Sequence, residues 1–210
     1  MSIVRVREHV NPLSKKYQTP ISPPDWSRLY HDLDRPLHLD IGCGKGRFLL
    51  QIAQAQPEWN FLGLEIREPL VDQANGWKTE LSLTNLHYLF CNANNSLRPL
   101  LGSLPVGRLQ YASIQFPDPW FKRKHQKRRV VQPDLIEALA DALAPDGKVF
   151  IQSDVEEVAV EMRNRFAAHP AFVCEHHDWL DSNPLPIPTE RETSTMERGE
   201  AVYRSLFVRQ

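Results

Sequence analysis

The chain has 210 residues, of which 41% are hydrophobic and 24% are charged, and its formal net charge is −1. This length and composition are ordinary for a soluble globular protein with one domain, and they exclude a low-complexity chain. The three cysteines, Cys43, Cys91 and Cys174, are odd in number and far apart, which argues against a disulfide framework and against a cysteine-rich zinc site.

Residues 1–30 contain four prolines and little periodicity, so we expect an arm that lies on the domain or is ordered by a partner. The domain itself is expected over residues 31–210. Charged residues interrupt the first twelve positions, so they offer no signal-peptide stretch and no membrane-spanning helix. We therefore expect a cytoplasmic protein that has no membrane partner, and nothing in the sequence implies an obligatory protein partner.

The most informative segment follows an expected strand at Leu37–Ile41. Asp40 is followed by Gly42, Gly44 and Gly46, and an apolar helical segment comes next. Alternating glycines allow a tight turn from strand to helix and let the backbone approach a ligand closely. The acid would repel a diphosphate, which disfavours a dinucleotide, but it would attract an ammonium and a sulfonium. S-adenosylmethionine carries both charges, so it is the expected cofactor.

The next expected strand, Phe61–Ile66, contains Glu65 close to its end. A doubly wound fold places an acid that binds ribose hydroxyls about twenty residues after its glycine turn. Glu65 is therefore the candidate ribose ligand.

Alternating strand and helix patterns continue along the chain and indicate a mostly parallel sheet of the Rossmann-like α/β class. A helix is expected at Asp134–Leu143, and Pro145 to Gly147 is expected to form a turn into the next strand. The last two strands have no good helical pattern between them, so we expect an antiparallel hairpin. The further expected strands are Leu86–Cys91, Gln110–Gln115, Gly147–Ser153, Phe172–His176 and Ala201–Val208.

The loop Phe116-Pro117-Asp118-Pro119-Trp120 follows the fourth expected strand, at the sheet edge where open α/β folds bind ligands. Two prolines fix the backbone around Asp118 and place its carboxylate beside aromatic rings, which suits a nucleobase.

A basic run, Lys122 to Arg129, comes directly after this loop. Six of its eight residues are Lys or Arg, although the whole chain is nearly neutral. We interpret the run as a surface that contacts nucleic-acid phosphates rather than as a merely solvated face.

With these motifs together, the chain resembles the bacterial tRNA (guanine-N7)-methyltransferase family, the TrmB type. The resemblance covers nearly the whole chain and includes residues 5–13, the glycine turn, Phe116 to Trp120 and Thr189 to Glu192. The glycine turn is common to many methyltransferases, whereas the Pro-Asp-Pro-Trp loop with its basic continuation is far more specific. The resemblance implies a class I methyltransferase that methylates a guanine in the tRNA variable loop.

The resemblance also implies roles for individual residues. Asp40, Glu65 and Asn92 contact the cofactor, together with the three glycines of the turn. By the same resemblance, Asp118 would be the active-site residue and would also contact the cofactor. The residues implied to contact the substrate are Lys122, Asp154, Thr189, Glu190, Arg191 and Glu192. No metal is implied.

Two positions depart from the family pattern. Asn92 stands where the family often has Asp, and its amide oxygen can still accept a hydrogen bond from the adenine amino group. Arg191 stands where the family commonly has Tyr, and its guanidinium can also stack on a base.

Guanine N7 has an in-plane lone pair and needs no general base, so alignment with the sulfonium methyl should supply most of the catalysis. Asp118 either stabilises the cationic product or orients the guanine through its hydrogen-bond donors, and both roles stay open. Two other functions are compatible with parts of the sequence. One is a methyltransferase for an exocyclic amine, and the other is a non-catalytic RNA-binding module, which the intact set of cofactor residues argues against.

Overall fold

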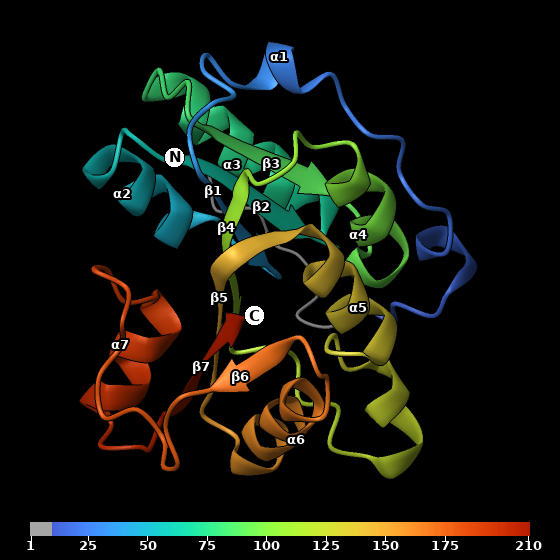
Figure 1. The fold of residues 1–210 in the computed structure, drawn as a ribbon, viewed down its shortest axis with the longest axis vertical. Coiled ribbons are helices and arrows are strands. Elements are labelled where there is room, and N and C mark those ends of the chain that lie inside the picture. The colour runs from blue at the N-terminus through green and yellow to red at the C-terminus, as the bar shows by residue number, and fades with distance from the viewer. Residues whose placement is uncertain (1–9) are drawn as a thin grey trace.

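The computed structural model describes residues 10–210. Its centre is a seven-stranded sheet with the order β3-β2-β1-β4-β5-β7-β6, covered by helices on both faces (Figure 1). The strands are β1 Leu37–Ile41, β2 Asn60–Glu65, β3 Leu86–Phe90, β4 Leu109–Gln115, β5 Leu143–Ser153, β6 Phe172–Cys174 and β7 Tyr203–Arg209.

The helices divide into two layers. The α-helices are α1 Trp26–Leu29, α2 Arg47–Ala55, α3 Glu68–Glu80, α4 Ala93–Gly102, α5 Pro133–Ala142, α6 Glu156–Ala167 and α7 Glu190–Glu197, with short 3-10 helices at Lys15–Tyr17 and Arg123–Arg128. One apolar cluster joins the sheet to α1, α4, α5 and α6 and includes Leu97, Leu139 and Phe166. A second cluster joins it to α2 and α3 and includes Leu49 and Val71.

The strands from β1 to β5 pair in parallel, and β7 pairs antiparallel with both β5 and β6. This arrangement confirms the expected Rossmann-like fold class with a mostly parallel sheet and an antiparallel C-terminal strand. β1 lies between β2 and β4, so the chain reverses its direction of travel across the sheet at this point. Ligands of open α/β sheets bind at such a reversal, beside the carboxyl ends of the strands.

The structure corrects the start of the fifth strand. β5 begins at Leu143, four residues before the predicted start, and the expected turn at Pro145 to Gly147 is an irregularity within the strand. The pairing with β4 passes from Leu143 directly to Lys148, so the intervening residues bulge out. Asp146 has a φ of 62°, a left-handed conformation that Asp tolerates better than most residues.

The structure also corrects the tail. The expected antiparallel pairing of the last two strands is present, but helix α7 lies between them in the chain. Thr189 caps this helix, because its Oγ1 accepts a hydrogen bond from the backbone N–H of Glu192 at 3.1 Å. Thr-x-x-Glu is a recognised helix-start pattern, and it is the signal that would have predicted α7.

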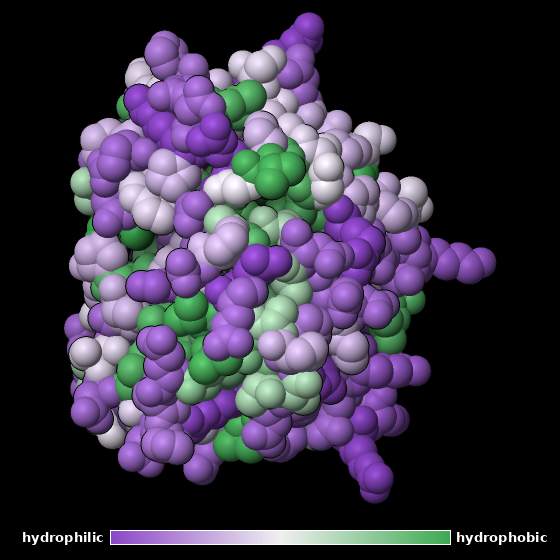
Figure 2. Space-filling model, in the orientation of Figure 1, coloured by the Kyte–Doolittle hydropathy of each residue, from purple (hydrophilic) through white to green (hydrophobic). Residues whose placement is uncertain are grey.

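Residues 10–30 follow the edge of the domain beside α4, as the blue chain in Figure 1 shows. Trp26 and Tyr30 are 6% and 3% exposed and belong to the main core, so the end of the arm is anchored in the fold. The first part of the family motif in the arm, residues 5–9, lies outside the described residues. Figure 2 shows mainly hydrophilic side chains on the face that Figure 1 presents. In the described part of the chain, no helix has both the length and the apolar character needed to cross a membrane.

Candidate active site

The glycine turn connects β1 to α2. Gly42, Gly44 and Gly46 have φ values of 80°, 59° and 73°, which L-residues with side chains rarely adopt. A Cβ at Gly46 would lie 2.6 Å from Cε1 of Tyr88 and 2.9 Å from Cβ of Ala74, so this glycine is also required by packing. The other two glycines face open space or only the end of the Arg67 side chain. The turn is therefore packed against the domain on its inner side, and its outer side lines a cavity, which we call the hollow.

Asp40 lies at the carboxyl end of β1 and is 4% exposed. Its Oδ1 accepts hydrogen bonds from Ser113 Oγ at 2.6 Å and from Gln115 Nε2 at 3.2 Å, both on β4. Burial raises the pKa of Asp40 to about 6, although these two hydrogen bonds act to lower it. The carboxylate borders the hollow, where a cationic group would stabilise its charged form.

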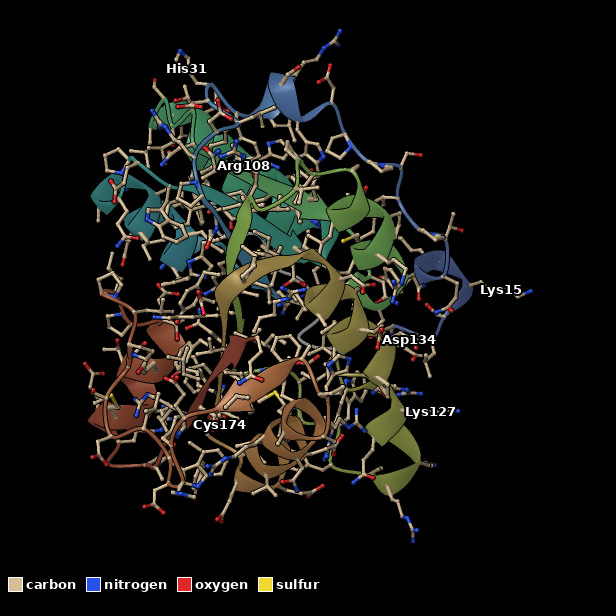
Figure 3. All side chains as sticks on the ribbon, in the orientation of Figure 1. Lys15, His31, Arg108, Lys127, Asp134 and Cys174 are labelled. Atoms are coloured by element: carbon tan, nitrogen blue, oxygen red, sulfur yellow. The ribbon has the colours of Figure 1, made fainter. Side chains whose placement is uncertain are left out.

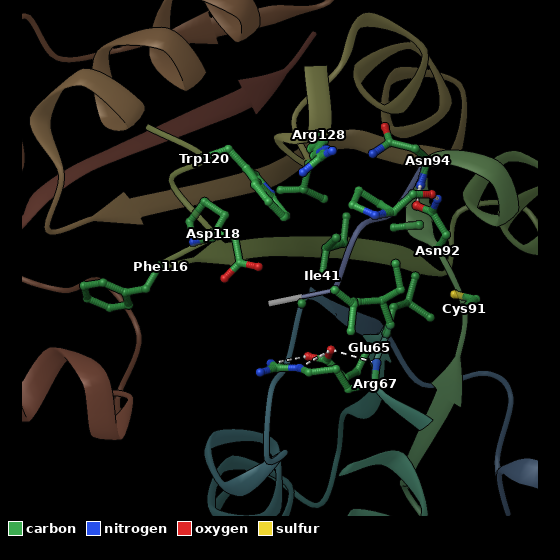
Figure 4. Close-up of a pocket in the computed structure, with 18 residues that line it drawn as sticks. Ile41, Glu65, Arg67, Cys91, Asn92, Asn94, Phe116, Asp118, Trp120 and Arg128 are labelled. Atoms are coloured by element: carbon green, nitrogen blue, oxygen red, sulfur yellow. Dashed lines mark hydrogen bonds and ion pairs between the residues drawn. The ribbon is translucent and has the colours of Figure 1, made fainter. Parts of the chain in front are cut away.

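Glu65 ends β2 and is 3% exposed. Its Oε2 accepts a hydrogen bond from the backbone N–H of Gly44 at 2.9 Å, which ties the acid to the glycine turn. Arg67 donates from Nε to Oε1 at 2.9 Å and from Nη2 to Oε2 at 3.0 Å (Figure 4). A ribose that binds Glu65 would therefore share this carboxylate with Arg67, a residue that sequence reasoning missed.

The side chain of Asn92 forms hydrogen bonds both with helix α4 and with the arm. Its Oδ1 accepts from Asn94 N–H at 3.2 Å and caps α4. Its Nδ2 donates to the carbonyls of Pro12 at 3.1 Å and Tyr17 at 3.2 Å, which holds the arm beside the pocket. An Asp at this position could make the cap but could not donate to the arm.

We therefore expect Asn92→Asp to loosen the arm. The carboxylate would keep the cap, but it would face two backbone carbonyls with no proton to offer, at a cost of about 1–3 kcal/mol for the unmade contacts. Hydrogen exchange of the backbone amides in residues 11–18 should become faster, while exchange within α4 should be unchanged. Unchanged protection of the arm would show that other contacts hold it.

The loop after β4 brings Asp118 to the same hollow. Phe116 and Trp120, on either side of Pro-Asp-Pro, have positive φ values of 50° and 43°, which are strained for bulky residues and are common at functional sites. The carbonyl of Gln152 accepts from Phe116 N–H at 2.9 Å, and the carbonyl of Pro119 accepts from Arg129 Nε at 2.7 Å. These contacts fix the loop at both ends.

Asp118 borders two adjoining cavities. One has a volume of about 130 Å³ and is lined by Glu65, Asn92, Trp120 and residues of the arm. The other has a volume of about 490 Å³ and is lined by Asp40, the glycine turn and the start of α7. In Figure 4, Asp118 and Trp120 approach the first cavity from the side opposite Glu65 and Arg67.

The structure corrects the interpretation of the basic run. Arg129 is 4% exposed, and its guanidinium is paired with Glu157 at 2.7 Å and with Glu161, both on α6. The guanidinium of Arg128 lies 4.9 Å from the centre of the Trp120 ring and lines the smaller cavity. Arg129 thus connects the loop to α6 from inside the fold, and it does not belong to a phosphate-binding surface.

The remaining basic side chains of the run are on the surface. Lys122, Arg123, Lys124 and Lys127 are exposed along the 3-10 helix and its start. Figure 3 shows Lys127 pointing away from the domain, on the same side as Lys15 of the arm. Lys122, implied to contact the substrate, lies outside the cavity lining.

Residues at the start of α7 line the larger cavity and form ion pairs there. Arg191 donates from Nη2 to Asp154 Oδ2 at 2.6 Å, and Glu190 pairs with Arg47 at the start of α2. Both ion pairs line the larger cavity, as does Thr189. Glu192 is different: it is 1% exposed, and protein side chains occupy both of its carboxylate oxygens.

The two cavities and their acids fit S-adenosylmethionine. The buried Asp40 suits the ammonium of the methionine part, and Glu65 suits the ribose hydroxyls. The smaller cavity, with apolar walls from Ile41 and Val130, suits the adenine. The larger cavity leaves space beside Asp118 for a second ring.

Comparisons with known proteins identify the family of this chain. The family model described as "Putative methyltransferase" matches residues 34–205. The tRNA (guanine-N(7)-)-methyltransferase of Trichormus variabilis is 62% identical over 100% of this chain and 98% of its own length. The enzyme of the same name from Synechococcus elongatus is 63% identical over 100% of this chain and 99% of its own.

Solved structures with low sequence identity share the fold. Precorrin-6y C5,15-methyltransferase from Geobacter metallireducens has a TM-score of 0.54 at 13% identity, covering 88% of this chain and 85% of its own. TrmN from Thermus thermophilus has a TM-score of 0.56 at 15% identity, covering 84% of this chain and 45% of its own. The fold is that of methyltransferases, and the full-length similarity is more specific: this chain belongs to the tRNA (guanine-N(7)-)-methyltransferase family.

Proposed function

We propose that this protein transfers a methyl group from S-adenosylmethionine to N7 of a guanine in the variable loop of tRNA. The observation that carries the proposal is the position of Asp118. Its loop borders both the cavity lined by Glu65 and the larger cavity lined by Asp40, so one site can hold the cofactor and a nucleobase together. We also propose that the protein works in the cytoplasm, and a tRNA substrate supports this.

In this mechanism, the side chains of the protein bind the cofactor and the guanine and align them with each other. The cofactor supplies an electrophilic methyl group on a sulfonium. Asp40 would hold the ammonium of this cofactor, and Glu65 would hold its ribose. The strained loop presents Asp118 to the guanine, where its carboxylate stabilises positive charge that develops on the purine or accepts from the guanine's donors.

Incubation with labelled S-adenosylmethionine and unmodified tRNA, followed by nucleoside analysis, tests the proposal. We expect the label in 7-methylguanosine. Label in an exocyclic-amine product would favour the rival methyltransferase function. Binding of tRNA without any transfer would favour the RNA-binding module.

The exposed lysines of the basic run are expected to contact tRNA phosphates. Each phosphate contact releases counterions, so Lys122→Ala, Lys124→Ala and Lys127→Ala combined should weaken tRNA binding and reduce the slope of log K against log salt by about two to three. Filter binding at several salt concentrations measures the slope. Lys148→Ala, towards the other end of the sheet, is the control. A triple variant with the wild-type slope would show that the run is a solvated face.

A further inference from the structure

A row of buried polar side chains connects the cofactor acid to helix α7. Its members are each at most 8% exposed: His38, Ser113, Asp40, Gln115, Gln152, Glu192 and Arg204. Buried polar groups are costly unless they are hydrogen-bonded, so such a row needs an explanation. The proposed mechanism uses only Asp40.

The direction of the hydrogen bonds is fixed at the α7 end. Arg204 donates to Glu192 Oε1 at 2.7 Å, while Oε2 of the same carboxylate accepts from Gln152 Nε2 at 3.1 Å. Because an ionised carboxylate can only accept, Gln152 must turn its NH2 group towards Glu192. The second hydrogen of that NH2 group goes to Gln115 Oε1 at 2.8 Å.

The orientation of Gln115 follows from this contact. Since its carbonyl faces Gln152, its NH2 group faces Asp40 and donates to Oδ1. On the other side, Ser113 gives its only hydroxyl hydrogen to the same Oδ1, so the nearby His38 Nε2, at 2.9 Å, is the donor to Ser113 Oγ. Both sides of the row thus direct donors at Oδ1 of Asp40, and no hydrogen bond from another described residue reaches Oδ2.

We propose that Gln152 is a positioning residue for cofactor binding, which holds the Gln115 amide in the orientation that donates to Asp40 and links that orientation to the seating of α7 through Glu192. The inference rests on the proposed function, because it requires Asp40 to bind the cofactor's ammonium. Glu192, which family resemblance assigns to the substrate, then acts from inside the fold. Glu190 and Arg191 of the same helix line the larger cavity, as Asp40 does. The row of hydrogen bonds therefore connects two parts of the wall of this cavity, helix α7 and the cofactor acid.

Gln152→Leu tests the proposal, because it keeps similar bulk and removes both donors. We expect affinity for S-adenosylhomocysteine, measured by calorimetry at pH 7, to fall about tenfold, as for a lost hydrogen bond to a charged group. Affinity should also depend on pH, since only the ionised Asp40 attracts the ammonium. Without Gln152, the Gln115 amide is no longer held in the orientation that donates to Asp40, so ionisation of Asp40 is harder. The pH at which half of the affinity is lost, between pH 7 and pH 5, should therefore move to higher pH.

Other ionisable groups near Asp40 are unchanged in this variant. Glu65 on β2, Cys43 in the glycine turn and Tyr88 on β3 are the groups that interact electrostatically with Asp40. Asn85→Leu is the matched control, because this buried amide donates to the carbonyls of Ala53 and Trp59, away from the site. It should lower thermal stability without changing the affinity or its pH midpoint.

Glu192→Gln is a second variant that changes no proposed cofactor contact. Arg204 still needs an acceptor, so the new amide should keep its oxygen there and turn its NH2 group towards Gln152. Gln152 and then Gln115 would have to reverse, which would present an oxygen to Asp40. The pH midpoint should therefore shift upward as in Gln152→Leu.

Asp40→Asn distinguishes an error in the proposed cofactor site from an error in the inference about Gln152. If Asp40→Asn binds S-adenosylhomocysteine as the wild type does, the proposed cofactor site is wrong. If it binds weakly while Gln152→Leu and Glu192→Gln keep the wild-type affinity and midpoint, only the inference about Gln152 is wrong.

Discussion

Asp118→Asn is expected to lower kcat on unmodified tRNA by about 10²-fold or more, with affinity for S-adenosylhomocysteine nearly intact. Methylation at N7 leaves a cationic purine, and the substitution removes a negative charge held beside it by a rigid loop. The amide keeps the shape of the side chain and one acceptor. Steady-state kinetics of the variant, with tRNA varied at saturating cofactor, measure the effect.

The same experiment distinguishes the two roles of Asp118. If the carboxylate only orients the guanine through its donors, Asn can replace part of that contact, and the loss should appear largely in KM for tRNA. Asp146→Asn is a suitable control, because it makes the same chemical change at an exposed position whose left-handed backbone Asn tolerates. Wild-type values of both constants for Asp118→Asn would show that the Pro-Asp-Pro-Trp loop is only a structural turn.

The sequence predicted the features that depend on backbone geometry. Glycines at alternate positions and two prolines around an acid restrict the chain locally, so the turn after β1 and the loop with Asp118 could be recognised without a structure. Their meeting at one hollow follows from the parallel order of the strands, which places both at the carboxyl edge of the sheet.

Features that depend on which way a side chain turns could not be predicted in this way. A run of basic residues does not show that Arg129 points inward, because its partners Glu157 and Glu161 lie on α6, about thirty residues later. Ser113 and Gln115 look like ordinary polar residues of a strand. Only the pairing of β1 with β4 places them beside Asp40.

The Asn92 position shows a third kind of limit. Comparison with the family pattern suggested an Asn that replaces the more frequent Asp and still accepts a hydrogen bond from the adenine amino group. The structure gives the amide a task that Asp cannot perform, which is to donate to carbonyls of the arm about 75 to 80 residues earlier in the chain. A substitution within a motif can therefore reflect a partner that the motif itself does not contain.

The buried pair of Arg204 and Glu192 is expected to dominate the response of this region to mutation. The two side chains are 6% and 1% exposed, and both Nε and Nη2 of Arg204 donate to the same oxygen of Glu192. Removing one partner of a buried ion pair leaves the other charge in a poorly solvated place. Here the remaining carboxylate would keep only its contacts with Gln152 and Asn183.

We expect Arg204→Met to reduce the free energy of unfolding by about 3–5 kcal/mol, as measured by urea denaturation, because it strands the Glu192 charge. Adding Glu192→Gln should recover more than half of that loss, since the double variant buries no unpaired charge. Arg98→Met is the control: it breaks the pair with Asp141, whose side chains are more than half exposed, and should cost less than about 1 kcal/mol. If Arg204→Met and Arg98→Met proved equally mild, the Glu192 carboxylate would have to be solvated or neutral in the folded protein, and the row of hydrogen bonds that begins at Glu192 would lose its fixed direction.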